Sequence, residues 1–291
     1  MFLTNSNFCG LLTQAESLSL LFDYDGIFLD YLKGLGEACE AETLGSAVWK
    51  QALRQVDIPE IHLNELLAVR QVKGAGAWPH IADRMAVIAD GHGFQITGEQ
   101  ILRAVEKVGL ELVKERGVGG VPFYSGANKF VELLYRAGAR MAIVTSCVDS
   151  FVESQLIVHG LNTRFEFIWG CNHIKQMGLP YKPNGSVWNR AASQLNSDLA
   201  VIFEDNSRNL VNAKMAVPGS LGVLFTREDT SQCSLEESEK CILESQQNLV
   251  KVFNEIDSEM TAEQFAKRIL VVDPIFQEQG FIPLISELEK Q

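Results

Sequence analysis

Short apolar runs alternate along the chain with segments whose apolar residues recur at helical spacing. The runs are Leu18–Phe22, Met141–Val144, Phe167–Trp169, Leu199–Phe203 and Leu221–Phe225. Helical patterns follow several of them, including 148–156 and 187–195. Buried strands that alternate with helices are typical of a parallel sheet covered by helices, so the pattern predicts an α/β fold.

Residues 31–121 interrupt this alternation with helical patterns and no convincing strand. Within them, Thr97–Gln100 matches a capping box, and Ile101, Val105 and Val108 then follow at helical spacing. We therefore expect a helical domain at 31–121, inserted into an α/β core that comprises 1–30 and 122–291.

The chain turns polar from Thr226 to about Asn248, before an apolar helical stripe resumes. Ser234–Glu237 and Thr261–Gln264 are capping-box candidates. The sequence therefore predicts a C-terminal part that is helical rather than disordered, with the polar stretch at the surface.

Charge narrows the range of partners. The 291 residues carry a formal net charge of -12, which disfavours nucleic acid or an anionic membrane as the main partner. The six cysteines form no C-x-x-C pair, and no stretch has the length of a membrane-spanning helix or the pattern of a secretory signal. We expect a cytoplasmic protein whose local groups still allow it to bind a phosphorylated metabolite.

Asp23 and Asp25 directly follow the first apolar run, with Gly26 behind them. Side chains two apart on a strand point to the same side, so both carboxylates can face one spot at the carboxyl end of the sheet. Such a pair suits a divalent cation or a shared proton, and an aspartate can attack phosphorus. A plain surface turn explains the same residues.

Two later segments also carry candidate site residues. Thr145 and Ser146 come after the second run, where a hydroxyl and free amides suit a phosphate, although Ser146 or Asp149 could simply cap a helix. Lys182 lies in a loop punctuated by glycine and proline, from which it could offset the carboxylates. Most lysines, however, are solvated surface groups.

Glu204 and Asp205 form a second acidic pair, at the end of the run Leu199–Phe203. One or two carboxylates with several waters are the usual ligands of Mg²⁺ in proteins. Asp205 or Ser207 could also open the helix that follows.

An aspartate pair, a hydroxyl turn, a lysine and an acidic pair follow one another along the chain. In this order they resemble the haloacid dehalogenase superfamily of phosphotransferases, in particular its capped members, the β-phosphoglucomutases and phosphoglycolate-type phosphatases. The stretches that carry the resemblance are Phe22–Gly26 with Asp30, Ile143–Ser146, Lys182–Pro183 and Phe203–Ser207. The resemblance implies a Rossmann-like parallel sheet core with an inserted helical cap domain. Two positions depart from the family pattern: Ile27 replaces a frequent threonine, and Asn209 replaces a usual glycine.

The resemblance also implies roles for the residues. Asp23 would be the nucleophile and Asp25 the general acid and base, while Thr145, Ser146 and Lys182 would hold the phosphoryl group. Mg²⁺ would be bound by the ligands Asp23, the backbone carbonyl of Asp25, and Asp205, with the assistance of Glu204.

Asp25 favours phosphate ester chemistry, because dehalogenases and phosphonatases of this superfamily lack an aspartate there. The mutases would call for a histidine early in the cap, and residues 31–61 contain none. We therefore expect a Mg²⁺-dependent phosphatase that hydrolyses a small phosphorylated metabolite through an aspartyl phosphate. The alternatives are a phosphomutase, and a related protein that binds ligands or partners without turnover.

Substrate choice is expected in the cap, where Arg70, Lys73, Trp78 and His80 cluster around two glycines. Arg70 and Lys73 are the predicted substrate contacts. The competing interpretation is that both are solvated charges, that Trp78 is a core residue, and that His80 is structural.

Overall fold

The computed structural model describes residues 1–24, 27–28, 44–71, 77–116, 123–182, 184–226, 234–256, 260–273 and 281–290, with only the backbone of 44–46, 70, 71 and 116. Within these ranges, six parallel strands form one sheet in the order β3-β2-β1-β4-β5-β6. The strands are β1 (Leu18–Phe22), β2 (Arg140–Val144), β3 (Phe167–Trp169), β4 (Leu199–Glu204), β5 (Leu221–Phe225) and β6 (Ile269–Val272).

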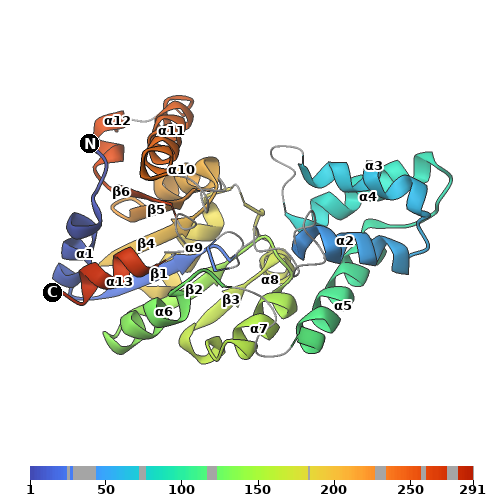
Figure 1. The fold of residues 1–291 in the computed structure, drawn as a ribbon, viewed down its shortest axis with the longest axis horizontal. Coiled ribbons are helices and arrows are strands. Elements are labelled where there is room, and N and C mark those ends of the chain that lie inside the picture. The colour runs from blue at the N-terminus through green and yellow to red at the C-terminus, as the bar shows by residue number, and fades with distance from the viewer. Residues whose placement is uncertain are drawn as a thin grey trace.

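Helices cover both faces of this sheet (Figure 1). One face carries α1 (Asn5–Gln14), α6 (Ala127–Arg136), α7 (Asp149–Val158) and α13 (Ile282–Leu288). The other carries α9 (Ser186–Leu195), α10 (Ser207–Ala216), α11 (Leu235–Asn254) and α12 (Ala262–Ala266). Because side chains alternate along a strand, Leu20 and Phe22 of β1 join the first core, and Leu21 joins the second. Two-sided burial explains why the strands read as continuous apolar runs.

The α/β prediction is confirmed, and the sequence missed one strand. The C-terminal part was expected to be helical, but Ile269–Val272 forms β6, which pairs with β5 so that Phe225 lies opposite Val272. Four apolar residues fit a helix or a strand equally well in a periodicity argument. The edge of β5 offers unpaired backbone groups, and hydrogen bonds to that edge favour the strand.

The three predicted capping boxes are present. Gln100 N donates to Thr97 Oγ1, and Thr97 N donates to Gln100 Oε1. Ser234 and Thr261 make the same reciprocal bonds at the starts of α11 and α12. From residue 235 onward, the polar stretch therefore belongs to α11, whereas 227–233 lie outside the described residues.

The insertion between β1 and α6 contains the helices α2 (Leu44–Gln55), α3 (Glu60–Gln71), α4 (Trp78–Gly91) and α5 (Gly98–Arg116). They lie to one side of the sheet and form the helical cap (Figure 1). α5 approaches α7 so closely that a Cβ on Gly109 would lie 2.6 Å from the ring of Phe151. The domain limits at residues 31 and 121 fall outside the described residues and stay predictions.

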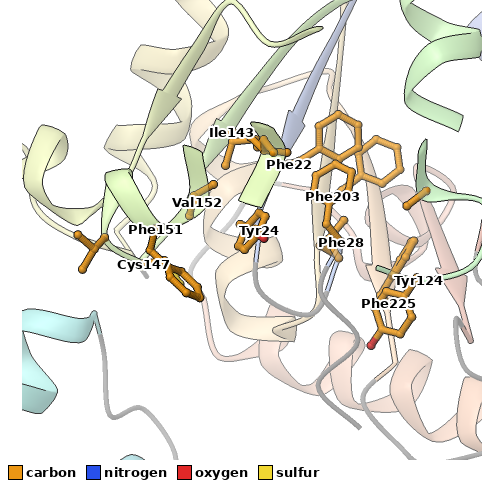
Figure 2. Close-up of a cluster of buried hydrophobic side chains, with 14 of the residues drawn as sticks. Phe22, Tyr24, Phe28, Tyr124, Ile143, Cys147, Phe151, Val152, Phe203 and Phe225 are labelled. Atoms are coloured by element: carbon orange, nitrogen blue, oxygen red, sulfur yellow. The ribbon is translucent and has the colours of Figure 1, made fainter. Parts of the chain in front are cut away.

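Aromatic rings surround the end of β1. Figure 2 shows Phe22, Phe28 and Phe203 gathered there, and the Phe22 and Phe203 rings stack at 4.5 Å. Tyr124 N donates to Phe28 O, which ties the chain after β1 to the segment before α6. The last residue of β1 is thus fixed in position. No helix in the described part of the chain combines the length and apolarity needed to cross a membrane.

Candidate active site

The strand β1 places Asp23 at the carboxyl end of the sheet. Asp23 N donates to Phe203 O at 2.9 Å, so the ladder between β1 and β4 continues into this residue. Its carboxylate is buried, and Oδ1 accepts a 2.7 Å hydrogen bond from Tyr24 N. A backbone donor favours the ionised carboxylate and fixes its orientation. Asp25, the predicted general acid and base, lies outside the described residues.

Lys182 bridges two carboxylates at the carboxyl ends of the neighbouring strands β1 and β4. Its Nζ lies 2.7 Å from Asp23 Oδ2 and 3.1 Å from Glu204 Oε1. Burial alone would lower the pKa of this ammonium, but the charges of Asp23 and Glu204 outweigh burial and raise its pKa above the ordinary value. The Lys182 ammonium also lies 5.0 Å from the ring centre of Trp188. Lys182 is therefore a buried cation inside the cluster, and the solvated-lysine alternative is wrong.

Glu204 is fully buried, and four hydrogen-bond donors offset the cost of burying its carboxylate. Oε2 accepts from the backbone N of Asp205 at 2.9 Å and of Asn206 at 3.2 Å. Oε1 accepts from Lys182 and, at 2.8 Å, from Asn209 Nδ2. The departure from glycine at position 209 thus supplies a donor to the site.

The helix after β4 begins in a different way from either capping prediction. Neither Asp205 nor Ser207 is its N-cap. Asn206 occupies that position and accepts from the backbone N of Arg208 and Asn209. Because a neighbour caps the helix, the carboxylate of Asp205 is not used as a cap.

Asp23, Glu204 and Asp205 form a cluster that fits a hard divalent cation. One carboxylate oxygen from each lies within 4.8 Å of the others, and all three residues are buried. Among the described residues of this buried site, three carboxylates against the ammonium of Lys182 leave two negative charges. Oxygen donors and this charge match the preferences of Mg²⁺.

The hydroxyl loop follows β2, next to β1. Thr145 is fully buried, and its N donates to Trp169 O, the carbonyl at the end of β3. Thr145 Oγ1 accepts from Cys147 N at 3.2 Å, so its own hydrogen remains to be donated. The strand register places Phe22 of β1 opposite Ile143 of β2, which brings Asp23 and Thr145 together at the carboxyl end of the sheet.

Neither residue suggested as a cap fills that role at the start of α7. Val148 is the N-cap and makes no side-chain capping bond, which leaves the half-buried Ser146 outside the helix. The carboxylate of Asp149 instead accepts from the backbone N of Gly170 and Asn172, at the start of α8 (Cys171–Gln176).

The cap contacts the carboxyl end of the sheet through the beginning of α4. Trp78 N donates to Ser146 O at 3.3 Å, and the Trp78 ring lies 5.8 Å from that of Phe151 in α7. The His80 ring meets the Tyr181 ring edge-on at 5.1 Å, one residue before Lys182. Trp78 and His80 therefore join the cap to the hydroxyl loop and to the lysine loop.

The two predicted substrate contacts are not tested by the structure. Arg70 belongs to α3, but its side chain lies outside the described residues, as does Lys73 entirely. Sequence reasoning also missed Asn209 and Trp188, which contact Glu204 and Lys182, and Tyr181, which meets His80 of the cap. The signal for Asn209 was its departure from the family glycine, whereas Trp188 and Tyr181 carry no pattern of their own.

A model of the haloacid dehalogenase-like hydrolases matches residues 20–223, which is more than half of the chain and includes Asp23, Lys182 and Asp205. The chain belongs to this family. No curated protein matches the chain in sequence.

Solved structures of other proteins share the fold of this hydrolase. CbbY from Rhodobacter sphaeroides in complex with phosphate is 17% identical, with a TM-score of 0.55 over 92% of this chain and 98% of that chain. A mutant of the same protein, in complex with xylulose-1,5-bisphosphate, is 16% identical, with a TM-score of 0.55 over 91% and 98%. A predicted phosphoglycolate phosphatase from Haemophilus somnus is 17% identical, with a TM-score of 0.50 over 73% and 87%.

Proposed function

We propose that this hydrolase is a Mg²⁺-dependent phosphatase that acts on a small phosphorylated metabolite. The observation that carries the proposal is the buried Asp23 carboxylate, held by Lys182 and Tyr24 N beside Glu204 and Asp205. A nucleophile, a fixed cation and a carboxylate cluster at one edge of the sheet are the parts that phosphoryl transfer requires.

The reaction has two steps. An oxygen of Asp23 attacks phosphorus while the ester P–O bond breaks, and the leaving oxygen takes a proton from Asp25. Water then attacks the aspartyl phosphate and gives a proton to Asp25, which releases inorganic phosphate and restores the Asp23 carboxylate. General acid–base help of this kind contributes about 10²–10⁴-fold to a rate.

Electrostatics supports the transfer. Lys182 provides a positive charge fixed within hydrogen-bonding distance of the Asp23 carboxylate, and Thr145 has a hydrogen to donate. Bound Mg²⁺ would be held by Asp23, Asp205 and Glu204 and would neutralise charge on the phosphoryl oxygens. The CbbY structure with a sugar bisphosphate supports a phosphorylated metabolite as the substrate class here. Arg70 and Lys73 in the cap remain the predicted contacts to the rest of that molecule.

The test is the hydrolysis of p-nitrophenyl phosphate with and without Mg²⁺. We expect turnover only with the metal, and a loss of at least about 10³-fold in Asp23→Asn, because the amide is not a nucleophile. Asp198→Asn is the matched control, because Asp198 precedes β4 at the opposite end of the sheet and binds Ser17. Turnover that survives Asp23→Asn, or a wild type with no metal-dependent activity, would refute the proposal.

A further inference from the structure

A second group of metal-ligating side chains lies in the cap. His62 and Glu65 belong to α3, where a spacing of three residues places them on one face of the helix. His92 directly follows α4 and is its C-cap. One ligand atom from each of the three lies within 4.8 Å of the others.

The contacts within this group are close. His92 Nε2 lies 2.8 Å from Glu65 Oε2, and the rings of His62 and His92 are 4.3 Å apart. A tetrahedral ion with ligand bonds of about 2.0–2.1 Å needs donor atoms roughly 3.3 Å apart. The histidines and the glutamate can reach that spacing by small side-chain rotations, because Glu65 is 57% exposed and His92 is 32% exposed.

The surrounding chain holds the histidines in place. The ring of Phe94 meets that of His62 edge-on at 5.4 Å, and Phe94 N donates to Ala89 O. Gly93 has a φ of 85°, which lets the chain turn back after His92. The paired rings therefore lie on α3 and at the C-cap of α4, which packs against α3, rather than on a free loop.

The donor types select the metal. Two imidazoles and one carboxylate suit Zn²⁺ and its neighbours Ni²⁺ and Cu²⁺, whereas Mg²⁺ prefers oxygen ligands alone. This is the reverse of the carboxylate cluster beside Lys182. Three protein ligands leave a fourth position for water, and the exposure of the group gives an ion a path in.

We propose that His62, Glu65 and His92 bind a divalent transition-metal ion of the Zn²⁺ class, which cross-links α3 to the end of α4. The site is separate from the candidate active site. α4 meets Ser146 at its first residue and has 14 residues, so a rise of about 1.5 Å per residue puts His92 about 20 Å farther along the helix.

The experiment is a calorimetric titration of the full chain with Zn²⁺ in excess Mg²⁺, so that Mg²⁺ competes with Zn²⁺ for the carboxylate cluster. We expect one Zn²⁺ per chain, and an affinity at least about 10-fold weaker in His62→Ala and in His92→Ala. His80→Ala is the matched control, because this cap histidine lies outside the group and should leave the affinity unchanged. Equal Zn²⁺ binding in wild type and His62→Ala, or no binding in wild type, would overturn the proposal.

A second measurement on the wild type does not depend on how the variants fold. Zn²⁺ should shift the imidazole NMR signals of His62 and His92, and the ring signals of the other three histidines, His80, His159 and His173, should stay in place. If Zn²⁺ moves no histidine signal, the site does not exist. Either result leaves the phosphatase test unaffected, because that assay depends on Asp23 and Mg²⁺.

Discussion

The two ends of the sheet each bury a lysine, in opposite surroundings. At the carboxyl end, Lys182 is 3% exposed and lies between Asp23 and Glu204. At the amino end, Lys214 of α10 is 7% exposed, and its ammonium donates to the carbonyl of Ser220, just before β5. Its neighbouring charge is the cation Arg268.

These surroundings move the two pKa values in opposite directions. The carboxylates raise the pKa of Lys182, whereas burial, together with Arg268, lowers the pKa of Lys214 from 10.5 to about 7. The stem of Lys214 fits because Gly222 has no side chain, since a Cβ there would lie 2.9 Å from Lys214 Cδ. Burial alone therefore does not set the charge state of a lysine, and the partners of the ammonium distinguish the two.

Removing the charge at the carboxyl end should have the largest effect. Lys182→Met leaves Asp23 and Glu204 buried without their counter-charge. In metal-free buffer we expect a loss of about 3–5 kcal/mol in the free energy of unfolding. With Mg²⁺ present, we expect phosphatase activity lowered by about 10²–10³-fold. Urea unfolding with and without Mg²⁺ measures the stability, and Mg²⁺ should recover part of it. The exposed Lys175→Met is the control, and equal stability of the two variants would contradict the electrostatic account.

Removing the charge at the amino end should alter the pH dependence of stability. The folded pKa of Lys214 lies below its unfolded value, so between pH 7 and 10.5 the unfolded state binds more protons. Stability from this group therefore rises with pH across that window, by up to roughly 1.4 kcal/mol per pH unit. In Lys214→Met this rise should disappear. Urea midpoints at pH 7 and 9.5, compared with those of the exposed Lys267→Met, measure the difference, and parallel curves would show that Lys214 does not titrate there.

Arg268 should give the smallest effect and sharpen the comparison. Its side chain donates to the carbonyls of Gly219 and Ser220 and adds to the fall in the Lys214 pKa. Arg268→Ala should move the start of the pH-dependent rise to higher pH, with a loss of about 1 kcal/mol from the hydrogen bonds. Arg268→Lys keeps the charge and should leave the start unchanged. If both variants move the pH at which stability begins to rise by the same amount, the charge of Arg268 does not contribute to the lowered pKa of Lys214.

Sequence patterns predicted most of the sheet because its strands are buried on both faces. β1, β2, β3, β4 and β5 were all found as apolar runs, and the capping boxes located three helix starts. β6 was missed, because a four-residue apolar run fits a helix or a strand, and only pairing with β5 makes this one a strand. The register between strands is a tertiary property, and the sequence alone did not contain it.

For the candidate site, the order of the motifs along the sequence predicted a group at the carboxyl end of the sheet. Its members are Asp23, Thr145, Lys182, Glu204 and Asp205. The order did not predict how they pair. The bridge from Lys182 to both carboxylates and the bond from Asn209 to Glu204 depend on side-chain directions at the ends of separate elements. The roles of Asp25, Arg70 and Lys73 stay predictions, because Asp25, Lys73 and the side chain of Arg70 lie outside the described residues.

The indole of Trp78 lies between the ring of Trp49 in the cap and that of Phe151 in the core, at 5.7 Å and 5.8 Å. If the cap swings away, Trp49 travels with Trp78, whereas Phe151 and the Ser146 carbonyl stay behind. Opening would thus expose one side of this fluorophore to water. The fluorescence of Trp78 would therefore report any movement of the cap away from the core.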